Sequence, residues 1–221
     1  MSGIAVFDVN ETMLDLGTLD PIFEEIFGVS EAKREWFARL LHTSVVYTAT
    51  GQYDAFGTLG RFALEATGAS RGVPIGDAAW DAVADGMGSL QAFPDVAPGL
   101  DALADDGWTL VALTNSSQDA AEHALTSAGL APRFAHILSV EAVGRFKPDP
   151  AAYLHAAETV DTAPSGLWMV AAHDWDLAGA RAVGMNTAYI ARPGSVYSNA
   201  YPDPDRSAAS LTDLARGLTG R

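Results

Sequence analysis

The sequence predicts an α/β protein, built on a doubly wound parallel sheet with a helical cap inserted after the first strand. Short apolar runs that end in polar residues alternate with stretches of helical periodicity. The first run, Ile4–Phe7, ends abruptly in Asp8, and the segment 16–92 that soon follows contains only helical patterns. Because parallel strands end at one edge of their sheet, we expect the polar residues that follow them to share one crevice.

The composition fits a globular protein of one or two domains and excludes several classes of function. Of the 221 residues 48% are apolar, and the formal net charge is −15, with a pI of about 4.4. Such an acidic chain argues against binding to nucleic acid or to an anionic membrane. The absence of cysteine excludes disulfides, thiolate nucleophiles and zinc–thiolate sites.

No apolar stretch is long enough to span a bilayer, and no basic segment followed by an apolar one marks a secretory signal. We therefore expect a cytoplasmic protein that acts on a small molecule. Whether it forms a homodimer stays open at this stage.

The core domain is expected to comprise residues 1–15 and 93–221. Apolar runs predict its strands at Ile4–Phe7, Trp108–Leu113, His136–Val140, Leu167–Ala172 and Asn186–Ile190. Helical spacing and glycine stops predict its helices at Pro98–Asp105, Gln118–Ala128, Pro150–Thr159, Asp176–Val183 and Ala208–Gly217.

Local signals refine three of these elements. A hydroxyl or amide in 114–117 is expected to cap the helix that begins at Gln118. Pro150 suits the first turn of its helix. The stretch 194–207 is rich in Pro, Asp, Tyr and Ser, and we interpret it as a loop.

The cap domain, residues 16–92, is expected to be wholly helical. Apolar residues recur there at helical spacing, and glycines mark the breaks. Trp36, Phe37 and Trp80 are predicted to form the core of the cap. The expected helices are Leu19–Phe27, Glu31–Tyr47, Tyr53–Thr67 and Ala78–Leu90.

The polar residues at the predicted strand ends can be read as one chemical site. A carboxylate beside a lysine stays ionised at neutral pH, and an ionised, desolvated carboxylate can form a covalent ester with a substrate. Hydroxyl, amide and backbone donors near a helix N-terminus can hold an anion. The residues concerned are Asp8, Thr114, Asn115, Ser116, Lys147, His173, Asp174 and Asp176.

These residues lie in four motifs that resemble, in order and spacing, those of the haloacid dehalogenase superfamily. The motifs are Phe-Asp8-Val-Asn-Glu-Thr12, Leu-Thr114-Asn115-Ser116, Lys147-Pro-Asp-Pro and Val-Ala-Ala-His173-Asp-Trp-Asp176. The resemblance covers residues 4 to 190 and implies a Rossmann-type core with an inserted cap.

Two positions separate this chain from the phosphatases of that superfamily. Phosphatases usually have an aspartate two residues after the nucleophile, where this chain has Asn10, which cannot supply a proton. They also usually have an acidic Mg²⁺ ligand four residues before the last motif's aspartate, where this chain has Ala172. Both departures favour a resemblance to the (S)-2-haloacid dehalogenases, which need no metal or other cofactor.

That resemblance implies a role for each motif residue. Asp8 attacks the carbon that bears the halogen, and water then hydrolyses the aspartyl ester. Thr12 and Lys147 orient and balance Asp8, while Asp176 holds Lys147 and helps to position the water. Substrate-binding roles are implied for Thr114, Asn115, Ser116, Tyr153, Trp175, Asn10 and Glu11.

Other positions leave alternatives open. His173 is either a general base for the water or a hydrogen-bonding substitute for the family's asparagine. Trp175 either packs or lines the site. The cap arginine that the family uses for halide falls by spacing at Tyr47, and Arg39, His42 or Arg61 could replace it. A Mg²⁺-dependent phosphatase and a catalytically idle binding protein of the same fold are the alternative functions.

Overall fold

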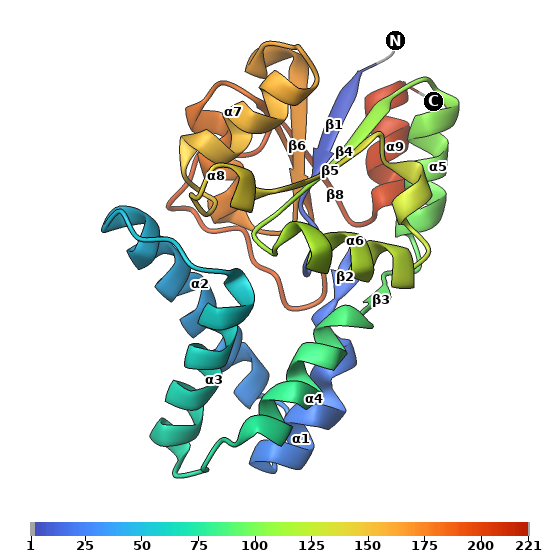
Figure 1. Ribbon diagram of the computed structural model, residues 1–221. Coiled ribbons are helices and arrows are strands. Elements are labelled where there is room, and N and C mark those ends of the chain that lie inside the picture. Colours follow the sequence, from blue (N-terminus) through green and yellow to red (C-terminus); the bar gives the residue numbers. More distant parts are fainter. Residues whose placement is uncertain (1–2, 221) are drawn as a thin grey trace.

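The chain is organised around a parallel sheet whose strands follow the order β5-β4-β1-β6-β7-β8 (Figure 1). The structure, a computed structural model, describes residues 3–220. The strands are β1 (Ile4–Phe7), β4 (Thr109–Thr114), β5 (His136–Ser139), β6 (Leu167–Ala171), β7 (Asn186–Ile190) and β8 (Arg206–Ala208). The order runs outward in both directions from β1, so the fold is the doubly wound sheet that the sequence predicts.

The position of β1 explains its unbroken apolar run. It pairs on one side with β4 and on the other with β6, so that Phe7 stands opposite both Ala112 and Val170. Helices cover both faces of the sheet, and the side chains of Ala5, Val6 and Phe7 are fully buried. A central parallel strand has no solvent face, and an alternating pattern is therefore absent.

The core helices lie on opposite faces of this sheet (Figure 1). One face is covered by α5 and α9, which pack against each other, and the other by α7 and α8. The bounds are α5 (Val96–Asp105), α6 (Gln118–Ser127), α7 (Pro150–Thr159), α8 (Asp174–Ala182) and α9 (Leu211–Thr219). Short 3-10 turns cover Leu16–Leu19, Ala131–Arg133, Val140–Ala142 and Pro164–Gly166.

A helical cap stands apart from the sheet at the lower end of Figure 1. Its helices are α1 (Asp20–Phe27), α2 (Ala32–Ala49), α3 (Phe56–Arg71) and α4 (Asp77–Gly88). Trp36 lies in its core, where it donates a hydrogen bond from Nε1 to the carbonyl of Gly60 (2.9 Å). We propose the domain boundaries at 15/16 and 92/93, which coincide with the ends of the antiparallel pair β2 (Leu14–Asp15) and β3 (Gln91–Ala92).

The structure corrects the sequence prediction at several local points. The strands β2, β3 and β8 were not predicted, because two or three residues carry no readable periodicity. The last of these lies in the segment interpreted as loop and pairs with β7. Helix α8 begins at Asp174 instead of Asp176, since its start is set by the strand that precedes it.

The predicted side-chain N-cap of helix α6 is also wrong. No side chain in 114–117 caps that helix, and the carboxylate of Glu141 accepts from the backbone amide of Gln118 instead (3.0 Å). By contrast, Pro150 begins α7 as predicted, after a capping contact from Asp149 to the amide of Ala151 (2.9 Å). Within residues 3–220 no helix is long and apolar enough to cross a membrane.

Candidate active site

Asp8 lies immediately after β1, at the point where the strand order of the sheet reverses. Its backbone amide donates to the carbonyl of Val170 in β6 (3.0 Å), so the chain stays fixed to the sheet at this residue. Doubly wound sheets bind their ligands at this switch point. The topology therefore places the Asp8 carboxylate in the crevice.

Three side chains converge on the Asp8 carboxylate. Thr12 Oγ1 donates to Oδ2 (2.6 Å), and Lys147 Nζ donates to Oδ1 (2.8 Å). His173 Nδ1 lies 3.1 Å from Oδ2. Because Thr12 Oγ1 also accepts from the amide of Ala172 (2.9 Å), the carboxylate is oriented by groups that are themselves fixed.

All three N–H groups of the Lys147 ammonium are bound within the protein, so none is left for a ligand. Its three N–H groups donate to Asp8, to Asp176 Oδ2 (2.7 Å) and to the carbonyl of Leu113 (3.0 Å), which fills the capacity of an ammonium group. Tyr153 OH in turn donates to Asp176 Oδ1 (2.6 Å). Lys147, Tyr153 and Asp176 thus form a buried support that fixes Asp8.

The electrostatics of this support keep Asp8 ionised. Burial alone would raise the pKa of Asp8, but the charge of Lys147 and the contacts with His173 outweigh burial and lower it well below its usual range. Burial would lower the pKa of Lys147, yet the charges of Asp176 and Asp8 raise it. The pKa of Asp176 is raised by burial and by the charge of Asp8, against the attraction of Lys147.

His173 links Asp8 to a second carboxylate, that of Glu11. Its Nε2 lies 3.1 Å from Glu11 Oε2, on the opposite side of the ring from Asp8. Burial alone would lower the pKa of His173, but the hydrogen bonds and charges of Asp8 and Glu11 raise it to about 10. At neutral pH the ring is therefore an imidazolium and cannot accept a proton while Asp8 is ionised, which favours the hydrogen-bonding role over the general base.

A small cavity of about 20 Å³ adjoins Asp8. The cap closes it with apolar side chains, while Trp175 stacks near His173 with ring centroids 5.2 Å apart. A space of this size holds about one water molecule, so a larger substrate requires the cap to open. The lining residues are Asp8, Asn10, Phe37, Leu41, Phe56, Thr114, Asn115, His173 and Trp175.

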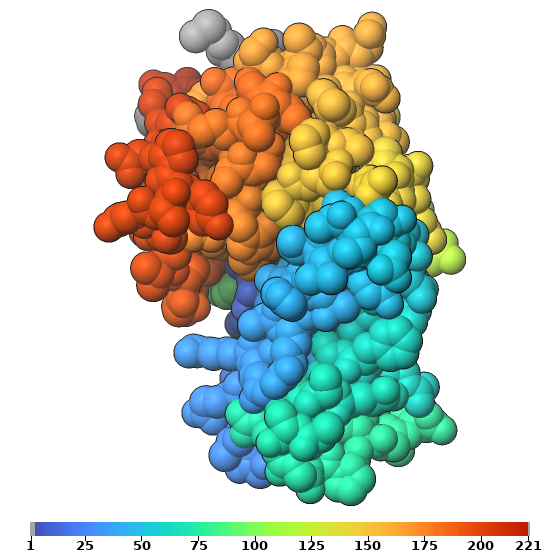
Figure 2. Space-filling model, turned by 90° about the vertical axis from the view of Figure 1, so that its left-hand side faces the viewer, coloured from blue at the N-terminus to red at the C-terminus, as the bar shows by residue number. Residues whose placement is uncertain are grey.

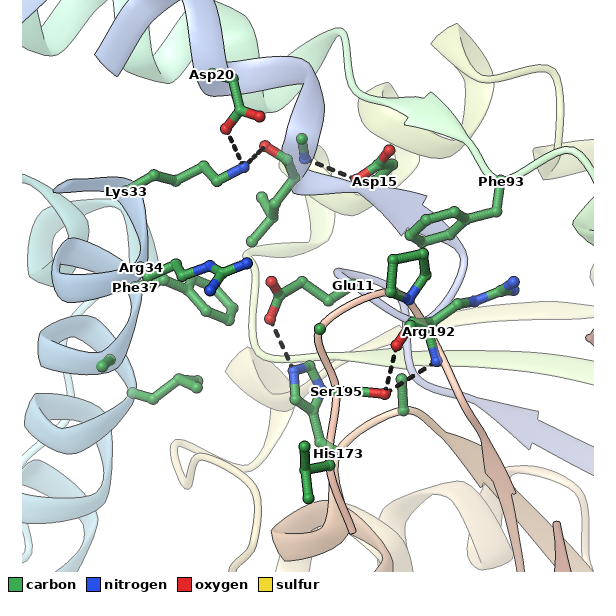
Figure 3. Close-up of a pocket in the computed structure, with 18 of the residues that line it drawn as sticks. Glu11, Asp15, Asp20, Lys33, Arg34, Phe37, Phe93, His173, Arg192 and Ser195 are labelled. Carbon is green, nitrogen blue, oxygen red and sulfur yellow. Dashed lines mark hydrogen bonds and ion pairs between the residues drawn. The ribbon is translucent and has the colours of Figure 1, made fainter. Parts of the chain in front are cut away.

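A second cavity of about 470 Å³ lies on the other side of His173, between α2 and the segment after β7. Figure 2 shows the recess between the blue surface of the cap and the red-orange surface of this segment. The two cavities share Phe37, Leu41 and His173 as lining residues. Glu11, Lys33, Arg34 and Arg192 also line the larger one, and Figure 3 shows their arrangement.

The structure does not bring every predicted residue to the small cavity. Tyr153 is fully buried behind Asp176, and Ser116 is absent from the lining. Tyr47 is also absent, and Arg39 borders a different pocket, where it forms an ion pair with Glu35 (2.9 Å). His42 borders that same pocket, and Arg61 pairs with Glu65 and Asp77. None of the four cap positions considered for halide thus lines the cavity beside Asp8, because the cap turns an apolar face toward it.

Sequence reasoning also missed residues near the site. Phe37 was predicted as cap core only, but it lines both cavities. Arg192 donates from Nε to the carbonyl of Thr12 (2.9 Å) and pairs with Asp95 (2.7 Å), so it supports the loop that carries Asp8. The only sequence signal for Arg192 is its place just after a strand end, which is too weak to select it.

The last motif lacks the geometry of a magnesium site. Ala172 offers no oxygen side chain, and the Asp174 carboxylate is bound to the amides of Trp175 (2.7 Å) and Ser198 (3.1 Å). Asp174 therefore points away from Asp8 and does not replace the missing ligand. Within residues 3–220 no three His, Asp or Glu side chains group in a way that could hold a metal ion.

A buried, ionised carboxylate on a lysine support, under a helical cap at the switch point of a doubly wound sheet, is an arrangement typical of hydrolases that use a carboxylate nucleophile. The family comparison agrees with this class. Residues 4–184 match the haloacid dehalogenase-like hydrolases, and the chain belongs to that family.

Individual relatives are similar over almost the whole chain. The sequence is 29% identical to (S)-2-haloacid dehalogenase 1 of Pseudomonas sp. strain CBS-3, over 96% of this chain and 95% of that protein. It is also 29% identical to (S)-2-haloacid dehalogenase 4A of Burkholderia cepacia, over 95% of this chain and 91% of that protein.

The fold matches a solved structure of the L-2-haloacid dehalogenase from Xanthobacter autotrophicus with covalently bound chloropropionic acid. The TM-score is 0.93 at 24% identity, and the match covers 100% of this chain and 99% of that one. At this level of identity the likeness shows the fold.

Proposed function

We propose that this chain is an (S)-2-haloacid dehalogenase, which displaces halide from a short 2-haloalkanoic acid and yields the 2-hydroxy acid. The observation that carries the proposal is the Asp8 carboxylate, ionised by Lys147 (2.8 Å) and oriented by Thr12 (2.6 Å), next to a cavity with apolar cap walls. The names of the relatives in the family support the same substrate class.

In the first step one oxygen of Asp8 attacks the carbon that carries the halogen. The new C–O bond forms as the C–halogen bond breaks, and the halide leaves with the bonding electrons. A halide ion is stable without a proton, so no acid is needed, and Asn10 in place of a second aspartate is compatible with this chemistry. Thr114 and Asn115 line the cavity, which supports their proposed role in binding the substrate carboxylate.

In the second step water attacks the carboxyl carbon of Asp8, and the ester oxygen leaves with the product. Ester formation removes the charge of Asp8, which is one of the two carboxylates that raise the pKa of His173. The pKa of the ring then falls, and the ring can release its proton to solvent and accept one from the attacking water. One proton is released per turnover, as the overall reaction requires.

A Mg²⁺-dependent phosphatase is the alternative within the family. It requires a proton donor for the leaving alkoxide and oxygen ligands for the metal. Asn10 and Ala172 remove one of each, and Asp174 points away. A catalytically idle binding protein would have no use for an oriented, ionised Asp8.

An isotope experiment tests the proposed mechanism directly. In a single turnover in ¹⁸O-water with enzyme in excess, the label should enter the peptide that contains Asp8 and not the hydroxy acid. Label found in the product, with Asp8 unlabelled, would mean that water attacks the substrate itself. A parallel screen for halide and phosphate release, with and without Mg²⁺, separates the dehalogenase from the phosphatase.

A further inference from the structure

We propose that Glu11 is a built-in anion that occupies the anion-binding face of His173 and moves to Arg34 of the cap when a substrate anion or halide arrives. The identity of the natural anion rests on the proposed function. The exchange itself is a property of Glu11, His173 and Arg34.

His173 is the cation available to an anion that binds near Asp8. Lys147 spends all three of its N–H groups on Asp8, Asp176 and Leu113. The cap contributes only apolar side chains to the lining of the small cavity, and His173 supplies its positive charge. Because Nδ1 of His173 is bound to Asp8, an anion can bind the ring only at Nε2, on the side of Glu11 and the larger cavity.

Of its two carboxylate partners, His173 can release only Glu11. Asp8 is fixed by Lys147 and Thr12, and its side chain is 8% exposed. The Glu11 side chain is 42% exposed and borders the cavity of about 470 Å³, so it has room to move. The backbone of Glu11 has a φ of 58°, which is uncommon outside glycine.

Arg34 faces Glu11 across the larger cavity. Figure 3 shows its guanidinium extending from α2 toward Glu11. Within residues 3–220 the Arg34 side chain forms no hydrogen bond or ion pair, whereas its neighbour Lys33 is bound to Asp20 and Arg192 to Asp95. Arg34 is thus the free cation in this wall, and it would receive the carboxylate that an incoming anion displaces.

The exchange links anion binding to the cap. Glu11 belongs to the core loop after β1, and Arg34 belongs to α2. A Glu11–Arg34 ion pair would join these two parts across the cavity of about 470 Å³. Arrival of the anion at His173 would therefore favour closure of the cap over the bound substrate.

The test is a bromide titration of the full chain without substrate, read from the ring nitrogen signals of His173 by NMR. Removal of the competing carboxylate in Glu11→Gln should tighten bromide binding about fivefold, the effect expected for a partly exposed ion pair. Arg34→Gln should weaken bromide binding in the wild type and have no effect in the Glu11→Gln background, because Arg34 acts only through Glu11. Arg61→Gln, an exposed arginine of α3, is the matched control and should leave both affinities unchanged.

Three results would overturn the proposal. Bromide could leave the His173 signals unchanged in both the wild type and Glu11→Gln. Glu11→Gln could bind bromide no more tightly than the wild type. Arg34→Gln could weaken binding equally in both backgrounds, which would make Arg34 a direct bromide ligand. Since none of these measurements needs turnover, a failed haloacid assay would leave the exchange intact and count only against the proposed substrate.

Discussion

Lys147 shows how a single residue determines the chemistry of the whole site. It is buried, and it lies between Asp8 (2.8 Å) and Asp176 (2.7 Å), so one positive charge balances two carboxylates. Removal of such a charge leaves uncompensated anions inside the protein. The cost exceeds that of an exposed ion pair, because buried charges are poorly screened.

We therefore expect Lys147→Ala to abolish halide release and to lower the free energy of unfolding by about 3 to 5 kcal/mol. Activity assays and urea unfolding measure the two effects. Arg39→Ala and Arg61→Ala, which break exposed ion pairs of the cap, serve as controls and should be mild. If a cap variant lost halide release while Lys147→Ala kept it, the roles assigned here would be wrong.

The protonated ring of His173 stabilises the folded protein, and this contribution is lost in alkali. Its contact with Glu11 accounts for part of that loss. Its folded-state pKa of about 10 lies above the ordinary value of 6.5, so its contribution is complete below pH 6.5 and disappears as the pH rises through 10. In Glu11→Gln the folded-state pKa should fall but stay above 6.5, because Asp8 remains. Urea unfolding at pH 7, 8.5 and 10 should show a smaller loss in Glu11→Gln than in the wild type. Equal losses would mean that Glu11 does not raise the pKa of His173.

At the scale of elements, α2 decides which substrates fit. Its residues Phe37 and Leu41 line both cavities, so with His173 they form the partition between about 20 Å³ and about 470 Å³. The Phe37 ring lies near His173, with centroids 6.3 Å apart. The position of this one helix thus limits the length of the substrate.

Phe37→Ala should join the two cavities and favour longer substrates. We expect the ratio of kcat/KM for 2-bromohexanoate to that for 2-chloropropionate to rise about tenfold, on the order of the 1 to 3 kcal/mol that a pocket gives per methylene. Phe62→Ala on the outer face of α3 is the matched control, because Phe62 is exposed. An unchanged ratio in Phe37→Ala would show that the tail does not reach the larger cavity.

At the scale of the molecule, the sheet gathers residues from distant parts of the chain. The strand order places Asp8 after β1 beside Thr114 at the end of β4 and His173 after β6, all at one edge. The supporting lysine comes from the loop before α7. The acidic Mg²⁺ ligand expected of a phosphatase is missing from this assembly, because residue 172 is alanine and Asp174 turns toward Ser198.

The catalytic rate should therefore survive a chelator. Halide release measured after dialysis against EDTA is expected to equal that of the untreated enzyme, and added Mg²⁺ should not raise it. Turnover that EDTA abolishes and Mg²⁺ restores would favour the phosphatase alternative.

The sequence by itself determined the architecture and the centre of the site. Long periodic segments and unbroken apolar runs have one physical solution each, a surface helix or a central parallel strand, so the sheet, the cap and most element bounds were predictable. The four motifs, through their resemblance to those of the haloacid dehalogenase superfamily, likewise pointed to Asp8, Thr12, Lys147 and Asp176. Very short strands such as β8 were beyond this reasoning.

Only the tertiary structure decided what surrounds that centre. Packing of α2 against the core turned Phe37 inward and left Arg39 bound to Glu35 on the other side of the helix. It also set His173 between two carboxylates, so that its ring is positively charged at neutral pH, where a free histidine is mostly neutral. The contacts of His173 with Asp8, Glu11 and Phe37 join residues more than a hundred positions apart, and local sequence carries no record of such distances.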